Sequence, residues 1–430
     1  MKILVIGSGG REHALTWALQ QTASAAHQIF CAPGNDGIAQ TAQCVRLKAT
    51  DTSALARFAA AEQIELTIVG SEAPLAAGLV DEFAARGLAV AGPRAVAAQL
   101  ESSKVFAKEF MARHNIPTAR FRTAESAAEA RDILRRGEFG DEATPVVVKA
   151  DGLAAGKGVV VARTRGEAET SVVELMEQGR VGLEAARRVV IEEALVGREA
   201  SLLLWTDGKD YALMPAARDH KRVGEGDKGP NTGGMGAITA PDVLDAATLQ
   251  RVVREIVEPT LAGAQADKLD FRGVLFIGLM FTATGPRVLE YNVRFGDPEA
   301  QAILVRLESD LAEIFAAVAH GRLGATRVAW SNDASACVVL AARGYPDQPE
   351  TGARITGLNE AAQQTGVQLF HAGTRRTPDG AWLTNGGRVL GVTAIAPTLD
   401  QALAHSYQTI RLINWAGMHY RRDIGQFSRP

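Results

Sequence analysis

The sequence predicts a multidomain fold that combines an α/β domain with α+β domains. The chain has 430 residues, and because a domain commonly holds about 150 residues, two to four domains are expected. Short β-rich runs alternate with helical patterns over the first hundred residues. Farther along, valine-rich strands are separated by long loops, and after Ser331 the pattern changes again. These changes indicate three units.

The first unit is expected to be a parallel sheet covered by helices. Parallel strands need a crossover connection, which is usually a helix, and the alternation of short strands with helices supplies it. A new unit is expected to start near Glu101. Before that point the predicted strands lie at 3–6, 66–69 and 88–91, and the helices at 12–21 and 75–86.

The second unit is expected to hold a mixed sheet. Its first helix ends before Pro117, which marks a probable boundary. The stretch 219–236 is rich in charge and glycine and has no apolar period, so it predicts a long functional loop. The other predicted segments are a helix at 102–114, two strands around a glycine-rich turn within 146–162, and strands within 189–204 and 274–293.

The last hundred residues are expected to form a small α+β domain. Strands are predicted at 336–340 and 388–394, and a helix at 399–415.

Charge and composition exclude several classes of partner. The 46 Lys and Arg residues against 49 Asp and Glu residues give a net charge of −3, so the chain lacks the positive field that nucleic acids or anionic membranes attract. With 47% hydrophobic and 22% charged residues, the composition is that of a folded protein. No stretch approaches roughly eighteen consecutive apolar residues, and the short apolar run after Lys2 is no signal peptide. We expect neither a nucleic-acid nor a membrane partner.

The cysteines and histidines carry little chemistry of their own. Cys31, Cys44 and Cys337 are too few and too scattered for a disulfide framework or a zinc site. The histidines lack metal-ligand spacing, and only His220, within Arg-Asp-His-Lys-Arg, stands in a notable context. Neither a Ser-His-Asp nor a Cys-His motif is present. A cytoplasmic protein without a protein nucleophile is expected.

A glycine-rich segment follows the first strand and opens the first helix. At 7–12 the sequence is Gly-Ser-Gly-Gly-Arg-Glu, and the backbone N–H groups of Gly9 and Gly10 at a helix N-terminus predict a phosphate site. The dinucleotide fingerprint is incomplete, because Glu12 stands at its third glycine position and no acidic residue follows the second strand. A tight turn without a ligand is the alternative.

A second glycine cluster, at 149–159, lies between two predicted strands. It fails the Walker pattern, because only three residues separate Gly152 from Gly156 and Lys157 is followed by Gly158. A hairpin flap is the better prediction. Such a flap can cover a triphosphate with backbone donors and Lys157, while Lys149 faces the nucleotide from the preceding strand. A flexible hairpin without a ligand is the alternative.

Carboxylates at two strand ends suggest nucleotide and metal contacts. Glu192 and Glu193 end an apolar strand, with Glu199 six residues later, where an adenine edge and ribose hydroxyls could be bound. Solvated strand-end charges are the alternative. Around residue 290, the period of two places Glu290, Asn292 and Arg294 on one strand face. Two oxygen ligands and a cation suit Mg²⁺ on phosphates, and the alternative is an edge strand with a polar face.

Taken in order, these motifs closely resemble the phosphoribosylamine-glycine ligase family, the glycinamide ribonucleotide synthetases of purine biosynthesis, in the ATP-grasp superfamily. The resemblance covers residues 1 to about 425. Ser8 and Ser71 depart from residues that the family often has, asparagine and proline, without putting its function in doubt. The motifs that carry the resemblance lie at 7–13, 33–35, 70–75, 149–159, 219–222, 229–236, 294–299, 371–374 and 384–389.

The resemblance implies a fold in three parts. These are an N-terminal biotin-carboxylase-like domain at 1–101, an ATP-grasp core at 102–330 with a lid at about 121–190, and a C-terminal domain at 331–430. It also implies small-molecule substrates and a monomer or weak dimer.

The resemblance further implies a set of site residues. Glu290 and Asn292 would hold Mg²⁺ or Mn²⁺, and Arg294, Asp297 and Lys157 would be catalytic. The ATP site would consist of Lys104, Lys149, Gly152, Gly156, Gly158, Glu192, Glu193, Leu195, Glu199 and Asn231. The substrate site would consist of Gly9, Gly10, Arg11, Asn35, Glu72 and Asp219.

The implied reaction joins glycine to 5-phosphoribosylamine at the expense of ATP. Because a carboxylate acylates poorly, ATP would first convert glycine to glycyl phosphate, which the ribosylamine nitrogen then attacks. The N-terminal glycine loop would serve phosphoribosylamine and the flap would serve ATP. The alternatives are another ATP-grasp purine ribonucleotide carboxylase or transformylase, a nucleotide-binding regulator without turnover, and an oxidoreductase.

Overall fold

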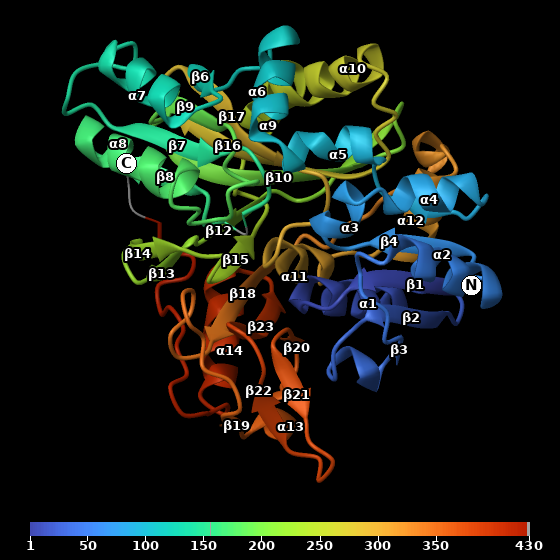
Figure 1. The fold of residues 1–430 in the computed structure, drawn as a ribbon. Coiled ribbons are helices and arrows are strands. Elements are labelled where there is room, and N and C mark those ends of the chain that lie inside the picture. Colours follow the sequence, from blue (N-terminus) through green and yellow to red (C-terminus); the bar gives the residue numbers. More distant parts are fainter. Residues whose placement is uncertain (155, 428–430) are drawn as a thin grey trace.

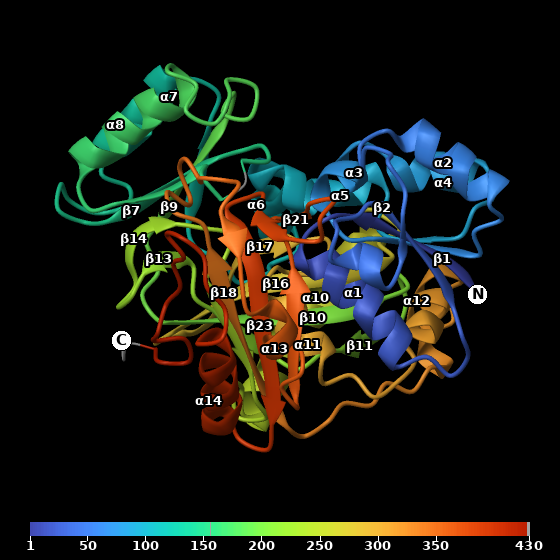
Figure 2. The same ribbon diagram turned by 90° about the horizontal axis from the view of Figure 1, so that it is seen from below.

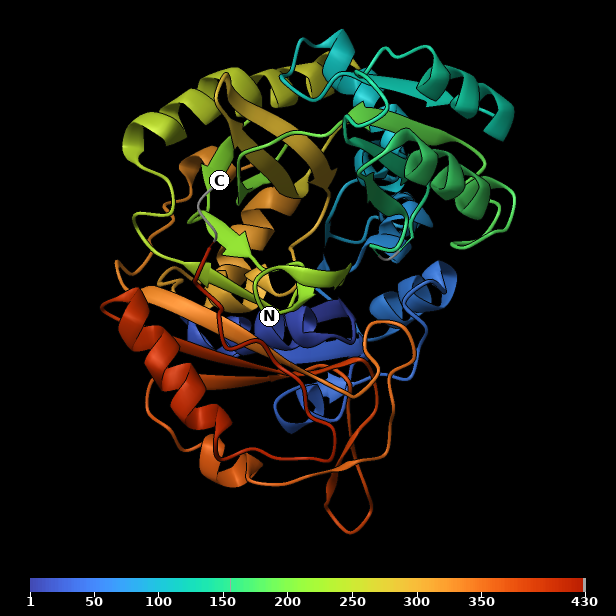
Figure 3. The same ribbon diagram turned by 90° about the vertical axis from the view of Figure 1, so that its left-hand side faces the viewer.

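The computed structural model describes residues 1–154 and 156–427, and Figure 1 shows their arrangement. The N-terminal domain, in blue, lies on the right, the core in green and yellow lies above, and the C-terminal domain, in orange and red, lies below. In Figure 3 the N-terminal domain lies between the lid, in teal and green, and the C-terminal domain. The predicted combination of an α/β domain with α+β parts is confirmed.

The N-terminal domain is the predicted parallel sheet with crossover helices. Its strand order is β3-β2-β1-β4-β5, and all of these pairs are parallel. The predicted helix at 75–86 is instead two short helices, because Gly78 between them takes a left-handed φ of 80°. The elements are β1 (Lys2–Gly7), α1 (Gly10–Gln21), β2 (Gln28–Pro33), η1 (Ile38–Gln40), β3 (Gln43–Cys44), α2 (Thr52–Ala61), β4 (Leu66–Val69), α3 (Glu72–Ala76), α4 (Leu79–Ala85) and β5 (Val90–Ala91).

The lid is a small sheet with its own core. Its strand order is β6-β9-β7-β8, and two helices pack against each other on its outer side (Figure 2). Buried residues such as Val148, Leu175 and Ile191 form a cluster drawn from the lid alone. The elements are β6 (Phe121–Ala124), α7 (Ala127–Arg135), β7 (Val146–Ala150), β8 (Val159–Ala162), α8 (Arg165–Met176) and β9 (Val189–Glu193).

The core sheet has the strand order β17-β16-β10-β12-β15-β18-β23-β20, with β11 also beside β10. The prediction of a mixed sheet is wrong, because every strand pair in it is antiparallel. Antiparallel neighbours can be joined by short hairpins, as β16 and β17 and also β10 and β11 are, whereas β10 and β16 are far apart in the chain. Its strands before residue 330 are β10 (Arg198–Thr206), β11 (Tyr211–Leu213), β12 (Ala217–Asp219), β15 (Gly236–Thr239), β16 (Gly273–Thr282) and β17 (Gly285–Asn292).

The stretch 219–236 is more ordered than predicted. Within it a two-stranded hairpin is formed by β13 (Arg222–Gly224) and β14 (Lys228–Asn231). The helices that cover the core sheet come from segments before and after residues 219–236. They are α5 (Ala95–Ser102), α6 (Lys104–Arg113), α9 (Ala246–Val252), a π-helical turn (Val253–Val257), α10 (Glu258–Ala266), α11 (Glu299–Leu304), α12 (Leu311–Ala319) and η3 (Leu323–Ala325).

The C-terminal domain continues the core sheet, because β15 pairs with β18. A three-stranded sheet of order β19-β22-β21 lies beside it. The predicted helix at 399–415 ends earlier, at Ile410. The elements are β18 (Ala334–Ala341), β19 (Arg354–Ile355), α13 (Leu358–Ala361), β20 (Val367–His371), β21 (Thr374–Arg376), β22 (Trp382–Thr384), β23 (Arg388–Ala396) and α14 (Leu399–Ile410).

In the described part of the chain, no helix combines the length and the apolar character that crossing a bilayer requires.

Candidate active site

One cleft of about 970 Å³ gathers most of the predicted site residues. It lies where the lid, the core sheet, the N-terminal domain and the C-terminal domain meet. Gly9, Gly10 and Asn35 do not line it. The predicted residues that do are Arg11, Glu72, Lys104, Lys149, Gly152, Gly156, Lys157, Gly158, Glu192, Glu193, Leu195, Glu199, Asp219, Asn231, Glu290, Asn292, Arg294 and Asp297.

The floor of the cleft is one face of the core sheet, and strand register decides which side chains lie on it. Ser201 of β10 pairs with Ala217 of β12 on one side and with Gly278 of β16 on the other. Gly278 pairs in turn with Glu290 of β17. Paired residues, and residues two apart in one strand, share a face. The same face therefore also carries Glu199, Asp219 and Asn292.

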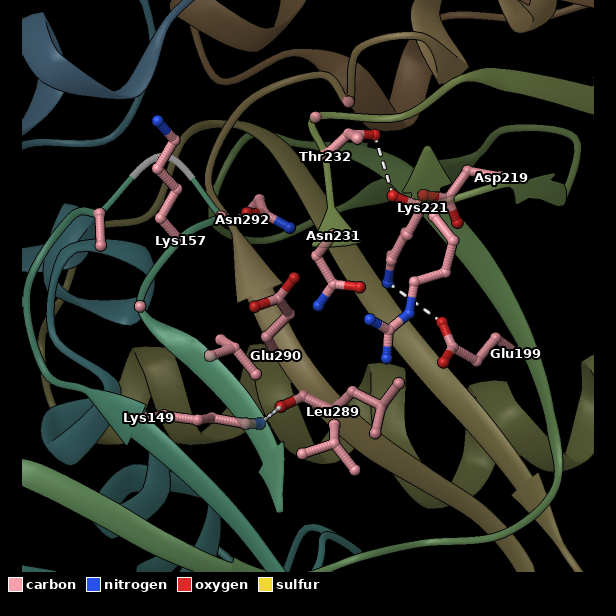
Figure 4. A pocket seen from close by; sticks show the side chains of 18 of the residues that line it. Lys149, Lys157, Glu199, Asp219, Lys221, Asn231, Thr232, Leu289, Glu290 and Asn292 are labelled. Carbon is pink, nitrogen blue, oxygen red and sulfur yellow. Dashed lines mark hydrogen bonds and ion pairs between the residues drawn. The ribbon is translucent and has the colours of Figure 1, made fainter. Parts of the chain in front are cut away.

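A bulge in β17 shapes one end of this floor. The register between β16 and β17 shifts at Leu279, so that Leu289 is left as an extra residue between Val288 and Glu290. The Lys149 ammonium donates to the freed Leu289 carbonyl at 3.1 Å (Figure 4). The bulge, which sequence periodicity did not predict, therefore connects the lid to the floor.

Glu290 is held ionised by lysines. Its Oε2 lies 2.9 Å from Lys104 Nζ, and Lys104 together with Lys221 and Lys149 holds the pKa of Glu290 well below its usual range despite burial. Asp151 positions Lys104, because its Oδ1 accepts from Ser103 Oγ at 2.7 Å and its carbonyl accepts from the Lys104 N–H at 2.9 Å. The carboxylate is thus available to a divalent cation across the relevant pH range.

The glutamates at the end of β9 have different surroundings. Glu192 is 2% exposed, and its Oε1 lies 3.0 Å from Lys149 Nζ and 3.1 Å from Lys108 Nζ. Burial lowers the pKa of Lys108 to about 8, although Glu192 opposes the shift. Glu193 forms an ion pair with Arg120 at 2.8 Å. The Glu192 carboxylate therefore positions Lys149, whereas the chain beyond Glu193 is the part open to a nucleotide.

The flap between β7 and β8 forms one wall of the cleft. Gly152 at its base is packed, because its N–H donates to the Ala185 carbonyl at 2.8 Å and an added Cβ would lie 2.9 Å from Ala185 Cα. Gly156 at its tip has a left-handed φ of 77° and faces Thr232 across ordinary contact distance. Lys157 is exposed and extends from the flap in Figure 4. Gly156 and Lys157 at the tip are therefore more open to a ligand than the packed Gly152 at the base.

The opposite wall comes from the segment that follows β12. Lys221 Nζ lies 3.1 Å from Glu199 Oε2, and the Thr232 hydroxyl donates to the Lys221 carbonyl at 2.9 Å. Asn231 lies beside Glu290 in Figure 4. The hairpin that the loop prediction missed therefore carries Asn231 to the side of the cleft where Glu290 lies.

The loop after β17 connects all three domains through arginines. Arg294 lies 2.6 Å from Glu101 and 3.2 Å from Glu72. Burial opposes ionisation of Glu72, but Arg294 and Arg11 outweigh it and lower its pKa. Asp297 lies 3.1 Å from Arg388 of β23, and despite burial its pKa is lowered by Arg388 and Arg11.

The N-terminal glycine loop is packed against protein atoms, which corrects part of its predicted role. The Gly9 N–H donates to Glu12 Oε2 at 2.6 Å, and Arg11 Nε donates to Glu12 Oε1 at 2.7 Å. A Cβ on Gly10 would lie 2.6 Å from Gln301 Nε2. The Gly9 N–H group, which the sequence predicted to bind a phosphate, is thus already hydrogen-bonded to Glu12. Arg11, in contrast, reaches the cleft and donates to the Phe295 carbonyl at 3.0 Å.

Asn35 is also occupied by the protein, so its predicted contact with ribose hydroxyls is not supported. Its Nδ2 donates to the carbonyls of Ser8 at 2.7 Å and His371 at 3.0 Å. Its Oδ1 accepts from the N–H groups of Gly37 and Ile38 at 2.9 Å. Asn35 connects the loop after β2 to the C-terminal domain.

Sequence reasoning missed several residues that position the site. Four residues outside the predicted set each hold a residue of the cleft in place. They are Glu12, Glu101, Asp151 and Arg388. Glu101 is buried and accepts from the Val293 N–H at 2.7 Å, and burial raises its pKa although Arg294 opposes the shift. Of these, only Glu12 had a local signal, a glutamate at the third position of a helix that a glycine precedes.

Three family models match the chain, and together they cover most of it. The phosphoribosylglycinamide synthetase N domain matches residues 1–101, its ATP-grasp (A) domain matches 102–300, and its C domain matches 335–427.

Relatives of similar length and a solved structure show the same likeness. Phosphoribosylamine--glycine ligases from Xanthomonas axonopodis pv. citri and Neisseria meningitidis serogroup A are 47% and 46% identical over 99% of this chain and 97% and 98% of theirs. The crystal structure of phosphoribosylamine--glycine ligase from Thermotoga maritima has a TM-score of 0.82 at 32% identity, covering 98% of this chain and 100% of that one. The biotin carboxylase domain of 2-oxoglutarate carboxylase from Hydrogenobacter thermophilus shares the fold, with a TM-score of 0.72 at 16% identity, over 97% of this chain and 91% of that one.

Proposed function

Because the chain belongs to the phosphoribosylglycinamide synthetase family, we propose that it is the enzyme that ligates glycine to 5-phosphoribosylamine. ATP drives the reaction, and the products are glycinamide ribonucleotide, ADP and phosphate. The observation that supports this best is the single cleft in which the lid lysines, the carboxylate and amide of β17, and the arginine loop 294–297 meet. The reaction is a step of de novo purine biosynthesis.

The chemistry needs positioning and charge neutralisation rather than a protein nucleophile. The glycine carboxylate attacks the γ-phosphorus of ATP, ADP leaves, and glycyl phosphate forms. The amine of phosphoribosylamine then attacks the glycyl carbonyl, and phosphate leaves as the new amide loses a proton. Bringing three substrates into one site accounts for much of the rate, and a flap that excludes water protects the acyl phosphate.

On the ATP side, we assign the phosphates to the flap and the lysines behind it. The tip of the flap, Gly156 to Gly158 with Lys157, faces the cleft from above, and Lys104 and Lys149 face it from below. Glu193, Leu195 and Glu199 line the path of the chain that leaves β9, where an adenosine would lie. Glu192 acts through Lys149, and Asn231 completes the opposite wall.

The residues of β17 fit a divalent cation. Glu290 supplies an ionised carboxylate and Asn292 an amide oxygen on the same face, and one or two protein oxygens together with substrate phosphates are what Mg²⁺ commonly takes. Mg²⁺ or Mn²⁺ there would neutralise charge on the phosphates during transfer. Asn292 Oδ1 also accepts from Arg294 at 3.3 Å, so that guanidinium would be near a phosphoryl group transferred at this end of the cleft.

On the ribosylamine side, we assign the anionic substrate to the arginines between the domains. Arg11 and Arg294 both line the cleft, as do Glu72, which would meet hydroxyl groups, and Asp297, whose carboxylate both arginines influence. Gly9 contributes by lacking a side chain, because an added Cβ would lie 3.1 Å from Glu12 Oε2, the carboxylate that binds Arg11. We assign Asp219 of β12, which also lines the cleft, to the part of the site where the glycine substrate would bind.

We extend the proposal to the setting of the enzyme. The three cysteines are free thiols in the described structure, which suits a cytoplasmic location. A monomer or weak dimer is sufficient, because one chain supplies every residue assigned above.

The experiment that tests the function measures ADP release with each candidate substrate. We expect ADP and phosphate to form only when glycine and phosphoribosylamine are both present. Turnover with bicarbonate or formate in place of glycine would instead assign the chain to a carboxylase or a transformylase. Appearance of AMP and pyrophosphate would contradict γ-phosphoryl transfer.

A further inference from the structure

Lys108 is a buried lysine directly behind the ATP side of the cleft. It lies one helical turn after Lys104 on the same face of α6, and it is 2% exposed. In the described part of the chain, Lys104 and Lys149 line the cleft whereas Lys108 does not. An effect of Lys108 on ATP therefore has to pass through a neighbouring side chain.

Lys108 and Lys149 share one carboxylate. Lys108 Nζ lies 3.1 Å from Glu192 Oε1, and Lys149 Nζ lies 3.0 Å from the same oxygen. Glu192 is 2% exposed, and the cavity beside the three groups holds about 10 Å³, which is the lower limit for one water molecule. Because little solvent screens these charges, the lysines have to balance the charge of Glu192.

A hydroxyl group fixes Lys108 in this position. Lys108 Nζ donates to Thr118 Oγ1 at 2.7 Å, and Thr118 Oγ1 donates in turn to the Val288 carbonyl at 2.7 Å. Thr118 lies on the linker into the lid, just before β6, and Val288 lies on β17 of the core. Lys108 is therefore held by protein groups at the junction of the lid and the core.

The charges of this cluster leave one ammonium group for a ligand. Lys104 pairs with Glu290 at 2.9 Å, and Lys108 is close enough to balance Glu192. Burial lowers the pKa of Lys108 to about 8, with Glu192 opposing the shift and the other two lysines adding to it, so Lys108 is still protonated at pH 7. The positive charge of Lys149 is the one that remains.

Lys149 can serve a phosphate only if Glu192 keeps another partner. The Lys149 ammonium has three N–H donors, and one of them goes to the Leu289 carbonyl at 3.1 Å (Figure 4). If Lys149 turned toward ATP without Lys108, the buried Glu192 carboxylate would lose its only cation, which is costly. With Lys108 in place, the charge of Glu192 stays balanced while Lys149 binds the ligand.

We propose that Lys108 is a positioning residue for ATP, because it balances the charge of Glu192 and so leaves the Lys149 ammonium free for the phosphates. The inference rests on the proposed function, since it takes the phosphates of ATP as the ligand of Lys149. Removing Lys108 should weaken the use of ATP. Removing the charges of Lys108 and Glu192 together should restore it.

The test compares the wild type with Lys108→Met and with a double variant that combines Lys108→Met and Glu192→Gln. ADP release gives KM for ATP and for glycine. We expect Lys108→Met to raise KM for ATP about tenfold and to change KM for glycine little, because the weakened charged contact is one to phosphate. In the double variant, KM for ATP should return to within about threefold of the wild type. A merely structural role predicts the opposite, because a second buried substitution adds to the damage of the first.

Arg165→Met is the matched control. Arg165 is a buried cation of the lid and donates to the carbonyls of Thr144 at 3.3 Å and Gly140 at 3.2 Å. Among the described residues it is outside the lining of the cleft. This variant should have a lower melting temperature and an unchanged KM for ATP.

An unchanged KM for ATP in Lys108→Met overturns the proposal, and so does a double variant as impaired as the single one. If Lys108→Met does not fold, Thr118→Val replaces it, because it removes the hydroxyl that fixes Lys108. Thr118→Val should raise KM for ATP about threefold, and an unchanged KM there also overturns the proposal. Calorimetric titration with a non-hydrolysable ATP measures the same effect without turnover. A wild type that binds this nucleotide but releases no ADP with glycine and phosphoribosylamine refutes the proposed function alone.

Discussion

The two glycine-rich loops of this chain look alike in the sequence and differ in the structure. In the loop after β1, the Gly9 N–H is bound by Glu12, and a side chain on Gly10 would meet Gln301. In the flap between β7 and β8, an added Cβ on Gly156 would lie 3.6 Å from the Thr232 carbonyl oxygen, which is an ordinary contact, and Lys157 is exposed. Glycine in the first loop makes room for protein atoms, whereas glycine at the tip of the flap leaves backbone open to a ligand.

The difference follows from what surrounds each loop. The first loop opens α1, which packs against α11 and β20, so parts of three domains close over it. The flap belongs to a lid whose apolar core is its own. The loop at the junction of domains is therefore closed by packing, whereas the loop on the independent lid stays open to the cleft.

The largest effect on this comparison is expected from Glu12→Ala. Arg11 is 8% exposed and would lose its ion-pair partner, while the Gly9 N–H would lose its acceptor. Breaking a buried ion pair from one side costs about 3 to 5 kcal/mol. Urea unfolding should show this loss in Glu12→Ala and almost none in Lys157→Ala. Equal stability of the two variants would remove the distinction between the loops.

Glu290→Gln is expected to lower kcat about a hundredfold or more without unfolding the protein. Losing a charged contact costs about 1.5 to 3 kcal/mol, and a misplaced cation adds to that. The shape of the side chain is kept, so the melting temperature should stay near that of the wild type. Near-normal kcat at saturating Mg²⁺ would show that β17 does not bind the metal.

Lys149→Ala and Lys157→Ala are each expected to reduce kcat/KM for ATP about tenfold and to affect glycine less. The two should differ in stability, because Lys149 lies 3.0 Å from the buried Glu192 and Lys157 is exposed. Steady-state kinetics with each substrate varied in turn, together with thermal melting, separates the two effects. If kcat/KM for ATP is unchanged in both variants, the flap is a flexible hairpin without a ligand.

Gly9→Ala is expected to raise KM for phosphoribosylamine about fivefold and to leave ATP binding unchanged. The backbone of Gly9, with φ of −90°, accepts an alanine, and its methyl group would lie 3.1 Å from Glu12 Oε2 and 3.4 Å from Asp297 Oδ2. Gly10→Val should instead lose stability through its contact with Gln301. Calorimetric titration with a stable ribose 5-phosphate analogue and with a non-hydrolysable ATP decides the assignment. Loss of ATP binding alone would reverse the roles of the loops.

The smallest effect is a pH dependence of stability at the junction that holds the first loop. His13 of α1 accepts from the His371 N–H at 2.9 Å, and burial lowers the pKa values of His13 and His371 to about 3 and about 4. Both histidines stay neutral in the folded state and protonate on unfolding near pH 6.5. Stability is therefore complete above that pH and decreases as the pH falls toward 4.

Between pH 7 and pH 6 the expected loss is about 1 kcal/mol for the two histidines together. Urea midpoints at the two pH values measure it. His13→Asn keeps an acceptor for the His371 N–H and should lose about half of the dependence. The same slope in this variant would exclude His13 as a source.

The sequence predicted which residues of the lid and of β17 come together, because the signal is local. Glu290 and Asn292 share a face through the period of two, and Lys149 and Lys157 bracket a glycine turn between strands. All of these residues line one cleft. The predicted mixed sheet failed for the opposite reason, since the direction of strands such as β16 depends on partners far away in the chain.

By itself, then, the sequence determined the order of the domains, the parallel N-terminal sheet and the residues within single elements that can carry charge to a ligand. Only the tertiary structure decided which glycine loop is open, that Asn35 donates to the His371 carbonyl, and that Glu12, Glu101 and Arg388 hold residues of the cleft. The physical reason is that hydrogen bonds and ion pairs depend on distance in space. Glu101 and Arg294 are 193 positions apart in sequence and 2.6 Å apart in the fold.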